Sequence, residues 1–460
     1  MRIKYLYSRI LILTLPALSI SCKKFVTVNP PVTQITSVTA FSTDQSAVSA
    51  VAGLYSQIMS NGGGFLNGAT TLYPSLTADE LILNAPDAQV GPFQDNAIPS
   101  TSSIIETNFW KFAYNYIYQA NATIEQLQLS TGVTKSVKLN LIAEMEFMRA
   151  LNYFYLVNLF GDVPLVLSTD YAATANLPRT ASTQVYQQII ADLSDAAANL
   201  PVDYPNGSPT RPNQLAAVAL LARVYLYLQQ WSSAESASSV VINSGTYALV
   251  SDLDSVFLAG SLEAILQFAP VSPYSDTYDG IIFNPQPSIQ PTYSIAQTLL
   301  NTFEANDFRM IHWINTDSIS GIAYTYPYKY KVGYAATISE YYMVLRLAEQ
   351  YLIRAEAEAQ QNELGAATID LNMIRNRANL PNLLPATANS QTGLLTAIMH
   401  ERQVELFTEF GHRWLDLKRT GLADAILGAE KTSWTPTDTL YPIPFSEIKS
   451  NSNLVQNPGY

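Results

Sequence analysis

The pattern of hydrophobic positions is clearest over residues 143–165, which read AEMEFMRALNYFYLVNLFGDVPL. Apolar side chains, among them Met148 and Leu151, recur at three- and four-residue spacing, so one broad stripe faces a core. Gly161 follows the last periodic position, and Pro164 prevents the helix from resuming. The stretch therefore predicts an amphipathic helix with a glycine stop, and nothing in it is catalytic.

The same helical period returns in other segments, and short turns join these segments into pairs. Thr43 or Asp44 is placed to cap the first helix. The alanines in the later segments let paired helices approach closely, which is typical of tetratricopeptide-like repeats. We expect about four pairs: 42–60 with 107–129, 137–160 with 183–200, 213–229 with 232–243, and 340–361 with 365–379.

Two regions interrupt the helical pattern. Residues 61–105 have no regular period, and a loop of this length in a compact body is usually functional or disordered. Residues 246–335 contain strand-like segments at 247–250 and 264–268. A third segment, 321–332, alternates strictly and would place Tyr324, Tyr326, Tyr328 and Tyr330 on one strand face, with Pro327 at an edge or interrupting the strand. The expected fold is mainly α, with a loop-rich, minor-β region.

Composition narrows the classes of function. The chain has 460 residues, of which 48% are hydrophobic and 13% are charged, as in folded globular proteins. Its formal charge of −12 repels phosphate backbones, so we expect no nucleic-acid partner. The single cysteine, Cys22, excludes an intramolecular disulfide and a thiolate metal cluster.

The position of Cys22 is informative. Residues 1–9 carry three positive charges, and residues 10–18 are apolar apart from a threonine and a proline, which is the pattern of a secretory signal peptide. A cysteine directly after such a peptide resembles a bacterial lipoprotein processing site. We therefore expect residues 1–21 to be a signal peptide, Cys22 to carry lipid, and residues 22–40 to form an extended tether.

Catalytic motifs are weak. His400 and Glu401 resemble the start of a zinc-protease helix, but Val404 stands where the second histidine is required. The alternating charges over residues 401–419 favour an ion-paired structural helix. Three pairs of carboxylates leave a glycosidase or a calcium site open: Asp79 with Glu80, Asp252 with Asp254, and Asp276 with Asp279.

Aromatic residues in loops are the better candidates for binding, because a core does not require them. These are Tyr73, Phe93, Tyr274, Tyr278 and Trp313. A sugar ring lays its C–H face against an aromatic plane, and its hydroxyls then need polar partners. Suitable polar residues in the same irregular regions are Asn67, Asn84, Gln94, Asn96 and Asp276.

The order of residues adds a resemblance. The segment EFMRALNYFYLVNLFGDVPLV resembles the signature of the SusD/RagB family of outer-membrane nutrient-binding lipoproteins. Three later segments resemble further blocks of that family in the same order: YYMVLRLAEQYLIRAEAEAQ, IMHERQVELFTEFGHRWLDLKRTGL and YPIPFSEIKSNSNLVQNPGY. The likeness covers nearly the whole chain after Cys22.

The resemblance implies a SusD-like fold, with an N-terminal helical-repeat region over 41–245 and a C-terminal RagB/SusD region over 246–460. It also implies a non-enzymatic oligosaccharide receptor on the outer membrane, without a cofactor, that serves a SusC-like TonB-dependent transporter. Three alternatives stay open: a peptide receptor of the same family, a secreted glycoside hydrolase using the loop carboxylates, and a scaffold that binds only the transporter.

Overall fold

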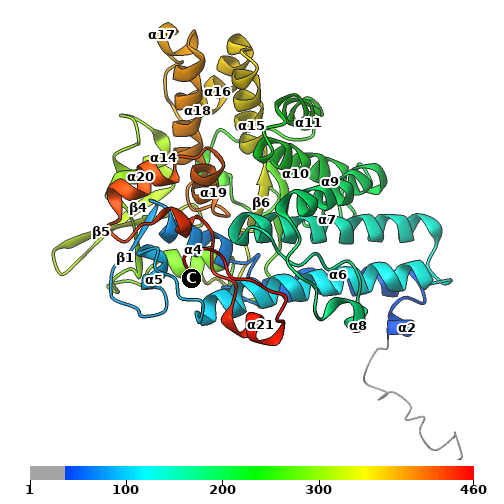
Figure 1. Cartoon of the computed structure of the whole chain (residues 1–460). Coiled ribbons are helices and arrows are strands. Elements are labelled where there is room, and N and C mark those ends of the chain that lie inside the picture. Colours follow the sequence, from blue (N-terminus) through cyan, green and yellow to red (C-terminus); the bar gives the residue numbers. More distant parts are fainter. Residues whose placement is uncertain (1–36) are drawn as a thin grey trace, which may run out of the picture.

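A computed structural model describes residues 37–460 (Figure 1). The predicted signal peptide, the lipid attachment at Cys22 and most of the tether lie outside the described residues. No helix between residues 37 and 460 is both long and apolar enough to cross a membrane. The division of the chain at residue 245 stays a prediction.

The body is a stack of helices that runs from α6 at the bottom of Figure 1 to α16 and α18 at the top. Successive helices pack in pairs, α3 against α6, α7 against α9, α10 against α11, and α15 against α16, which confirms the four predicted pairs. These helices are α3 (Asp44–Ser60), α6 (Phe112–Leu129), α7 (Lys135–Phe160), α9 (Ser182–Asn199), α10 (Gln214–Tyr227), α11 (Trp231–Asn243), α15 (Leu347–Gln360), α16 (Leu364–Arg377) and α18 (Gln391–Leu406).

Local chemistry sets the ends of these helices where the sequence predicts them. The hydroxyl of Thr43 accepts the N–H of Ser46, and the hydroxyl of Ser46 accepts the N–H of Thr43, which completes a capping box at the start of α3. Helix α7 ends at Gly161, whose φ of +72° suits glycine. Its predicted stripe is buried, and so is most of the rest of its surface.

The predicted helix over 340–361 is wrong in its first two turns. Residues Tyr342–Arg346 form strand β6, which pairs antiparallel with β2 (Ala264–Phe268), and α15 begins only at Leu347. Val344 is therefore a strand residue. Aromatic and β-branched side chains in this segment pack well in a sheet, and β2 provides the pairing partner.

The other strand predictions are confirmed only in part. Strand β2 is present, whereas residues 247–250 form no strand. Strand β5 (Ile322–Pro327) pairs with β4 (Ile314–Ile319) as a hairpin at the left of Figure 1, and it ends at Pro327 as the proline predicts. The predicted tyrosine stripe is therefore shorter, because Tyr328 and Tyr330 lie beyond the strand.

Residues 61–105 are not a disordered loop. They form β1 (Leu81–Leu83), which pairs with β3 (Tyr293–Ile295), and helix α4, which is buried along its whole length. The remaining helices are short: α2 (Ser37–Ala40), α4 (Ala69–Thr77), α5 (Gly91–Gln94), the π-helix η3 (Ile105–Lys111), α8 (Tyr171–Thr174), η4 (Leu253–Ser255), α12 (Tyr278–Phe283), α13 (Gln297–Leu300), α14 (Phe308–His312), α17 (Pro385–Ala388), α19 (His412–Arg419), α20 (Ala423–Glu430), η5 (Pro436–Thr439) and α21 (Phe445–Ser450).

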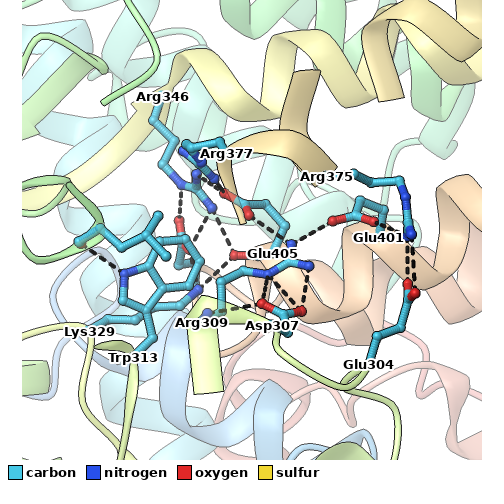
Figure 2. A network of polar contacts seen from close by, with 12 residues as sticks. Glu304, Asp307, Arg309, Trp313, Lys329, Arg346, Arg375, Arg377, Glu401 and Glu405 are labelled. Atoms are coloured by element: carbon cyan, nitrogen blue, oxygen red, sulfur yellow. Dashed lines mark hydrogen bonds and ion pairs between the residues drawn. The ribbon is translucent and has the colours of Figure 1, made fainter. Parts of the chain in front are cut away.

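The charges over 401–419 are buried and ion-paired, which confirms their structural role (Figure 2). At the centre, the carboxylate of Glu405 accepts from Arg346 at 2.6 Å and from Arg309 at 3.0 Å, and it also pairs with Arg377. Glu409 pairs with Arg346 at 2.7 Å. The segment is two helices and not one, because the chain turns between Leu406 and His412 through residues with positive φ.

Candidate functional site

A cavity of about 430 Å³ lies where the glycine-rich segment after α3 meets the segment that leads into α12. This volume is within the range of small-ligand sites, which is roughly 300–1,000 Å³. Two stretches far apart in the sequence contribute most of the wall. We call it the α3–α12 cavity, and it is lined by Met59, Ser60, Gly62, Asn67, Pro270, Val271, Ser272, Ser275, Asp276, Tyr278 and Ile281.

The ring of Tyr278 lies against the backbone of the glycine-rich segment. A Cβ atom on Gly68 would stand 2.2 Å from Cδ1 of Tyr278, and one on Gly62 would stand 2.8 Å from its Cδ2. A Cβ on Gly63 would stand 2.9 Å from the Tyr278 hydroxyl oxygen. Only glycine allows the backbone to approach a ring so closely. The segment therefore forms a cradle that fixes the position of Tyr278 in the cavity wall.

Asn67 presents an acceptor in the same wall. Its amide nitrogen Nδ2 donates to the carbonyls of Ile58 at 3.4 Å and Met59 at 3.1 Å, near the end of α3. These two acceptors fix the orientation of the amide, since Oδ1 cannot face them. The Oδ1 atom is buried and has no hydrogen-bond partner in the protein.

Asp276 presents a second acceptor. Its Oδ2 atom accepts the N–H of Ser339 at 2.9 Å, the hydroxyl of Ser339 at 2.9 Å and the N–H of Glu340 at 2.8 Å. Its Oδ1 atom is buried and has no partner. One oxygen therefore holds the loop in place, while the other is left without a donor. An unpaired buried acceptor costs roughly 1–3 kcal/mol, so a ligand that supplies a donor is favoured.

Two further acids stand close to this wall. The carboxylate of Glu340 accepts the N–H groups of Lys331 at 2.7 Å and Val332 at 3.0 Å. Burial, together with the charge of Asp276, raises the pKa of Glu340 to about 7. Burial also raises the pKa of Asp279 well above its ordinary value, which favours the uncharged acid.

Tyr274 and Tyr334 are exposed beside the cavity. Their side chains are 69% and 68% exposed, and the two segments are joined by a bridge between Ser275 and Tyr334. The N–H of Ala335 also donates to the carbonyl of Tyr274 at 3.1 Å. Sequence analysis missed Tyr334, although an aromatic residue after Gly333 in an irregular segment meets the criterion that identified Tyr274.

Three predicted ligand-binding aromatics are corrected, because their rings are buried in the core. Tyr73 lies in α4 with its ring centroid 4.6 Å from that of Phe93, and Phe93 has no exposed surface. Trp313 is fully buried, its Nε1 donates to the carbonyl of Leu253 at 3.0 Å, and Lys329 stands 4.7 Å from its ring (Figure 2). These rings offer no free face to a ligand. The prediction that Tyr274 and Tyr278 bind ligand stays a prediction.

The polar candidates divide in the same way. Asn67 and Asp276 line the cavity, whereas the other three do not. Asn84 donates to the carbonyl of Pro291 at 2.8 Å and to Ser294 at 2.7 Å. Gln94 accepts the N–H of Leu83 at 2.6 Å, and Asn96 accepts from Lys431 at 2.9 Å. These three side chains hold loops to the body.

The paired carboxylates have structural partners as well. Asp79 pairs with Arg413 at 2.6 Å, and Asp252 caps the short helix η4. Burial raises the pKa of Glu80 to about 8. Within residues 37–460, no three His, Cys, Asp or Glu side chains are grouped so that they could hold a metal ion.

Comparison with known proteins gives consistent matches. Residues 315–460 match a family model described as "SusD family", and residues 87–226 match one described as "Starch-binding associating with outer membrane". SusD-like protein P2 of Formosa agariphila is 29% identical over 76% of this chain and 80% of its own length. Starch-binding protein SusD of Bacteroides thetaiotaomicron is 27% identical over 75% of this chain and 76% of its own.

Solved structures show the same fold. A SusD superfamily protein from Bacteroides vulgatus has a TM-score of 0.80 at 21% identity and covers 91% of this chain and 99% of its own. A laminarin-binding SusD-like protein has a TM-score of 0.77 at 24% identity and covers 91% of this chain and 100% of its own. The two family models, the relatives and the shared fold agree, and together they support this chain as a SusD-like family member.

Proposed function

We propose that the protein is a non-catalytic receptor that binds oligosaccharides in the α3–α12 cavity. The observation that carries the proposal is the combination of a fixed aromatic ring with two unpaired buried acceptors in one wall. Tyr278 supplies the ring, and Asn67 and Asp276 supply the acceptors.

This combination suits a sugar. The C–H face of a pyranose packs on an aromatic plane, and the adjacent hydroxyls donate to carbonyl or carboxylate oxygens. When a sugar hydroxyl donates to an otherwise unpaired acceptor of the wall, the hydrogen bond offsets part of the cost of having removed that acceptor from water. The exposed rings of Tyr274 and Tyr334 extend the apolar surface beyond the cavity, so a chain of several sugar units has further rings to contact.

The cellular setting is part of the proposal. Lipid on Cys22 and a tether over residues 22–40 would hold the receptor on the outer membrane, exposed at the cell surface. There it would deliver oligosaccharide to a SusC-like TonB-dependent transporter, without a cofactor or a metal ion. The signal-like start of the sequence supports this setting, as does the description of the matching family model as associating with the outer membrane.

A binding role is favoured over hydrolysis by what the acids do. One carboxylate oxygen of Asp276 accepts three hydrogen bonds from Ser339 and Glu340, and burial raises the pKa of Asp279 well above its ordinary value. Glycoside hydrolysis needs one carboxylic acid and one carboxylate on opposite sides of the bond that breaks. Asp276 and Glu340 instead accept hydrogen bonds from backbone groups, which suits positioning of loops.

The test is a binding screen of the chain that begins at residue 23. It is titrated with soluble polysaccharides and with a peptide mixture, beside the variants Tyr274→Ala and Tyr278→Ala. Tyr171→Ala is the matched control, because Tyr171 is 80% exposed in α8 and does not line the cavity. We expect a glycan to bind, both loop variants to weaken binding, and the control to bind like the unmodified protein.

Other results would change the proposal. Peptide capture without glycan binding would make the protein a peptide receptor. Release of reducing ends from a bound glycan, abolished by Asp276→Asn, would make it a hydrolase. Glycan binding that neither loop variant weakens would keep the receptor and refute this site.

A further inference from the structure

The charge of the cavity wall limits the class of glycan. Within the described chain, the residues that line the α3–α12 cavity include no lysine, arginine or histidine. Their one ionisable acid is Asp276, which is almost fully buried. A carboxylate in a partly desolvated wall repels another anion more strongly than it would in water. The wall therefore has a negative charge and no cation to balance it on the ligand side.

Lys331 is a cation close to the cavity segments, but its ammonium group is bound to other residues. The N–H of Lys331 donates to Glu340, and the neighbouring Ser339 donates to Asp276 in the cavity wall. Lys331 therefore lies near the segments that line the cavity. Its ammonium group donates to the carbonyl of His312 at 2.6 Å and pairs with Asp254 at 2.9 Å. These contacts occupy the ammonium group, and Lys331 does not line the cavity, so it does not pair with Asp276 there.

Backbone dipoles add to the negative wall. Met59 and Ser60, which line the cavity, are the last two residues of the 17-residue helix α3. The C-terminal end of a helix carries a partial negative charge, because its last carbonyls have no helical partner; in α3 two of these carbonyls, of Ile58 and Met59, accept from Nδ2 of Asn67. At the other side, the short helix α12 begins at Thr277, whose hydroxyl accepts the N–H of Gly280 at 3.0 Å. That contact uses a donor that an anion would otherwise attract.

The sense of the hydrogen bonds points the same way. The unpaired atoms of the wall, Oδ1 of Asn67 and Oδ1 of Asp276, are acceptors and need donors. A hydroxyl group can donate, whereas a carboxylate or a sulfate ester on a sugar can only accept. Replacing a hydroxyl that donates to one of these acceptors by an anionic group would leave that acceptor unpaired and would add repulsion from Asp276.

We propose that the cavity selects uncharged, hydroxyl-rich glycans and rejects glycans that carry uronate or sulfate groups. This inference rests on the proposed receptor function and adds the charge class of its ligand. It assigns two tasks to Asp276, which are to accept a hydroxyl donor and to exclude anions.

The experiment compares two groups of ligands by isothermal titration calorimetry. The uncharged group contains laminarin, amylose and a neutral galactan, and the anionic group contains alginate, polygalacturonate and a carrageenan. We expect the uncharged ligand that binds best to bind at least about tenfold more tightly than any anionic one at low salt. High salt should lower this ratio of affinities, because it screens the repulsion between Asp276 and an anionic ligand.

Asp276→Asn tests the residue itself. The asparagine keeps an oxygen for Ser339 and Glu340 and removes the charge, so the ratio should fall by about tenfold. Asp195→Asn is the matched control, since it removes one charge from the exposed face of α9 and should leave the ratio unchanged. If Asp276→Asn does not fold, the salt dependence of the unmodified protein still tests the repulsion.

The outcomes separate the two proposals. Anionic glycans that bind as tightly as uncharged ones would overturn the selection and leave the receptor function intact. A ratio that neither salt nor Asp276→Asn changes would overturn the role of Asp276. If the protein binds peptides but no glycan, the proposed role as an oligosaccharide receptor is overturned, and this inference is overturned with it.

Discussion

Replacing Gly68 by alanine tests whether the glycine cradle positions Tyr278. The new methyl group would stand 2.2 Å from Cδ1 and 2.8 Å from Cε1 of that ring. Carbon atoms in ordinary contact are about 3.5–4.0 Å apart, so the ring must move by more than about 1 Å. The backbone of Gly68 also has φ +107°, a conformation that alanine rarely adopts.

The magnitude has two parts. Holding a residue other than glycine in such a conformation costs about 1–3 kcal/mol. Forcing an extra methyl group into a packed region costs about 1–3 kcal/mol more. We therefore expect Gly68→Ala to lower the free energy of unfolding by about 2–6 kcal/mol, and the displaced ring to weaken glycan binding. Gly53→Ala is the matched control, because no atom lies within 4 Å of its added Cβ in helix α3.

The assay is urea unfolding followed by circular dichroism, with glycan titration of the folded variants. Gly53→Ala should be neutral or more stable by up to about 1 kcal/mol, as alanine favours a helix. The double variant Gly68→Ala with Tyr278→Ala should lose less free energy of unfolding than the sum of the losses of the two single variants, because the clash between the methyl group and the ring is gone. Equal stability and equal glycan affinity of Gly68→Ala and Gly53→Ala would refute the cradle.

The remaining predictions concern exposed and buried groups. Tyr274→Ala should weaken glycan binding without lowering the melting temperature, whereas Trp313→Ala should cost about 3–5 kcal/mol of stability; a melting curve beside a titration separates the two effects. Arg346→Met removes one of the cations that pair with the buried carboxylates of Glu263, Glu405 and Glu409. It should destabilise by about 3–5 kcal/mol in urea unfolding, and a loss below about 1 kcal/mol would contradict the network. The pKa of Glu80 is raised by burial to about 8, so the folded state binds more protons than the unfolded state between about pH 4.5 and 8. Its contribution to stability should therefore be lost as pH rises through about 8, and Glu80→Gln should remove that part of the pH dependence of unfolding.

The helical body could be predicted from sequence because its signals are local and repeated. Periodic apolar positions and the cap at Thr43 gave elements whose ends fall within a few residues of those observed. The prediction was wrong over the first two turns of the helix at 340–361, because Val344 and Leu347 happen to keep a helical spacing. Pairing with β2, about 80 residues away, decides the conformation there, and no local pattern contains that partner.

The site was harder to predict for a related reason. An aromatic residue in an irregular segment was expected to be exposed, but Tyr73 and Phe93 pack against each other in a segment that folds into the core. Burial of a ring depends on which distant elements cover it, and large rings gain most from being covered. Asn67 and Asp276 were identified from the same segments. Their unpaired oxygens could only be found in three dimensions.

The buried charges explain why the cavity wall is held in one geometry. Strand β2 leads into Pro270 and the cavity, while β6 follows the turn at Ser339 that holds Asp276. Arg346 at the end of β6 pairs with Glu263 at 2.8 Å, with Glu405 in α18 at 2.6 Å and with Glu409 after α18 at 2.7 Å, so both strands are fixed to the helical body. Buried ion pairs add little net stability, but an arrangement that separates them leaves unpaired charges and is strongly disfavoured. A wall fixed in this way needs little ordering when a sugar binds, and so more of the contact energy is kept as affinity. By this reasoning Arg346→Met should weaken glycan binding even under conditions in which the protein stays folded.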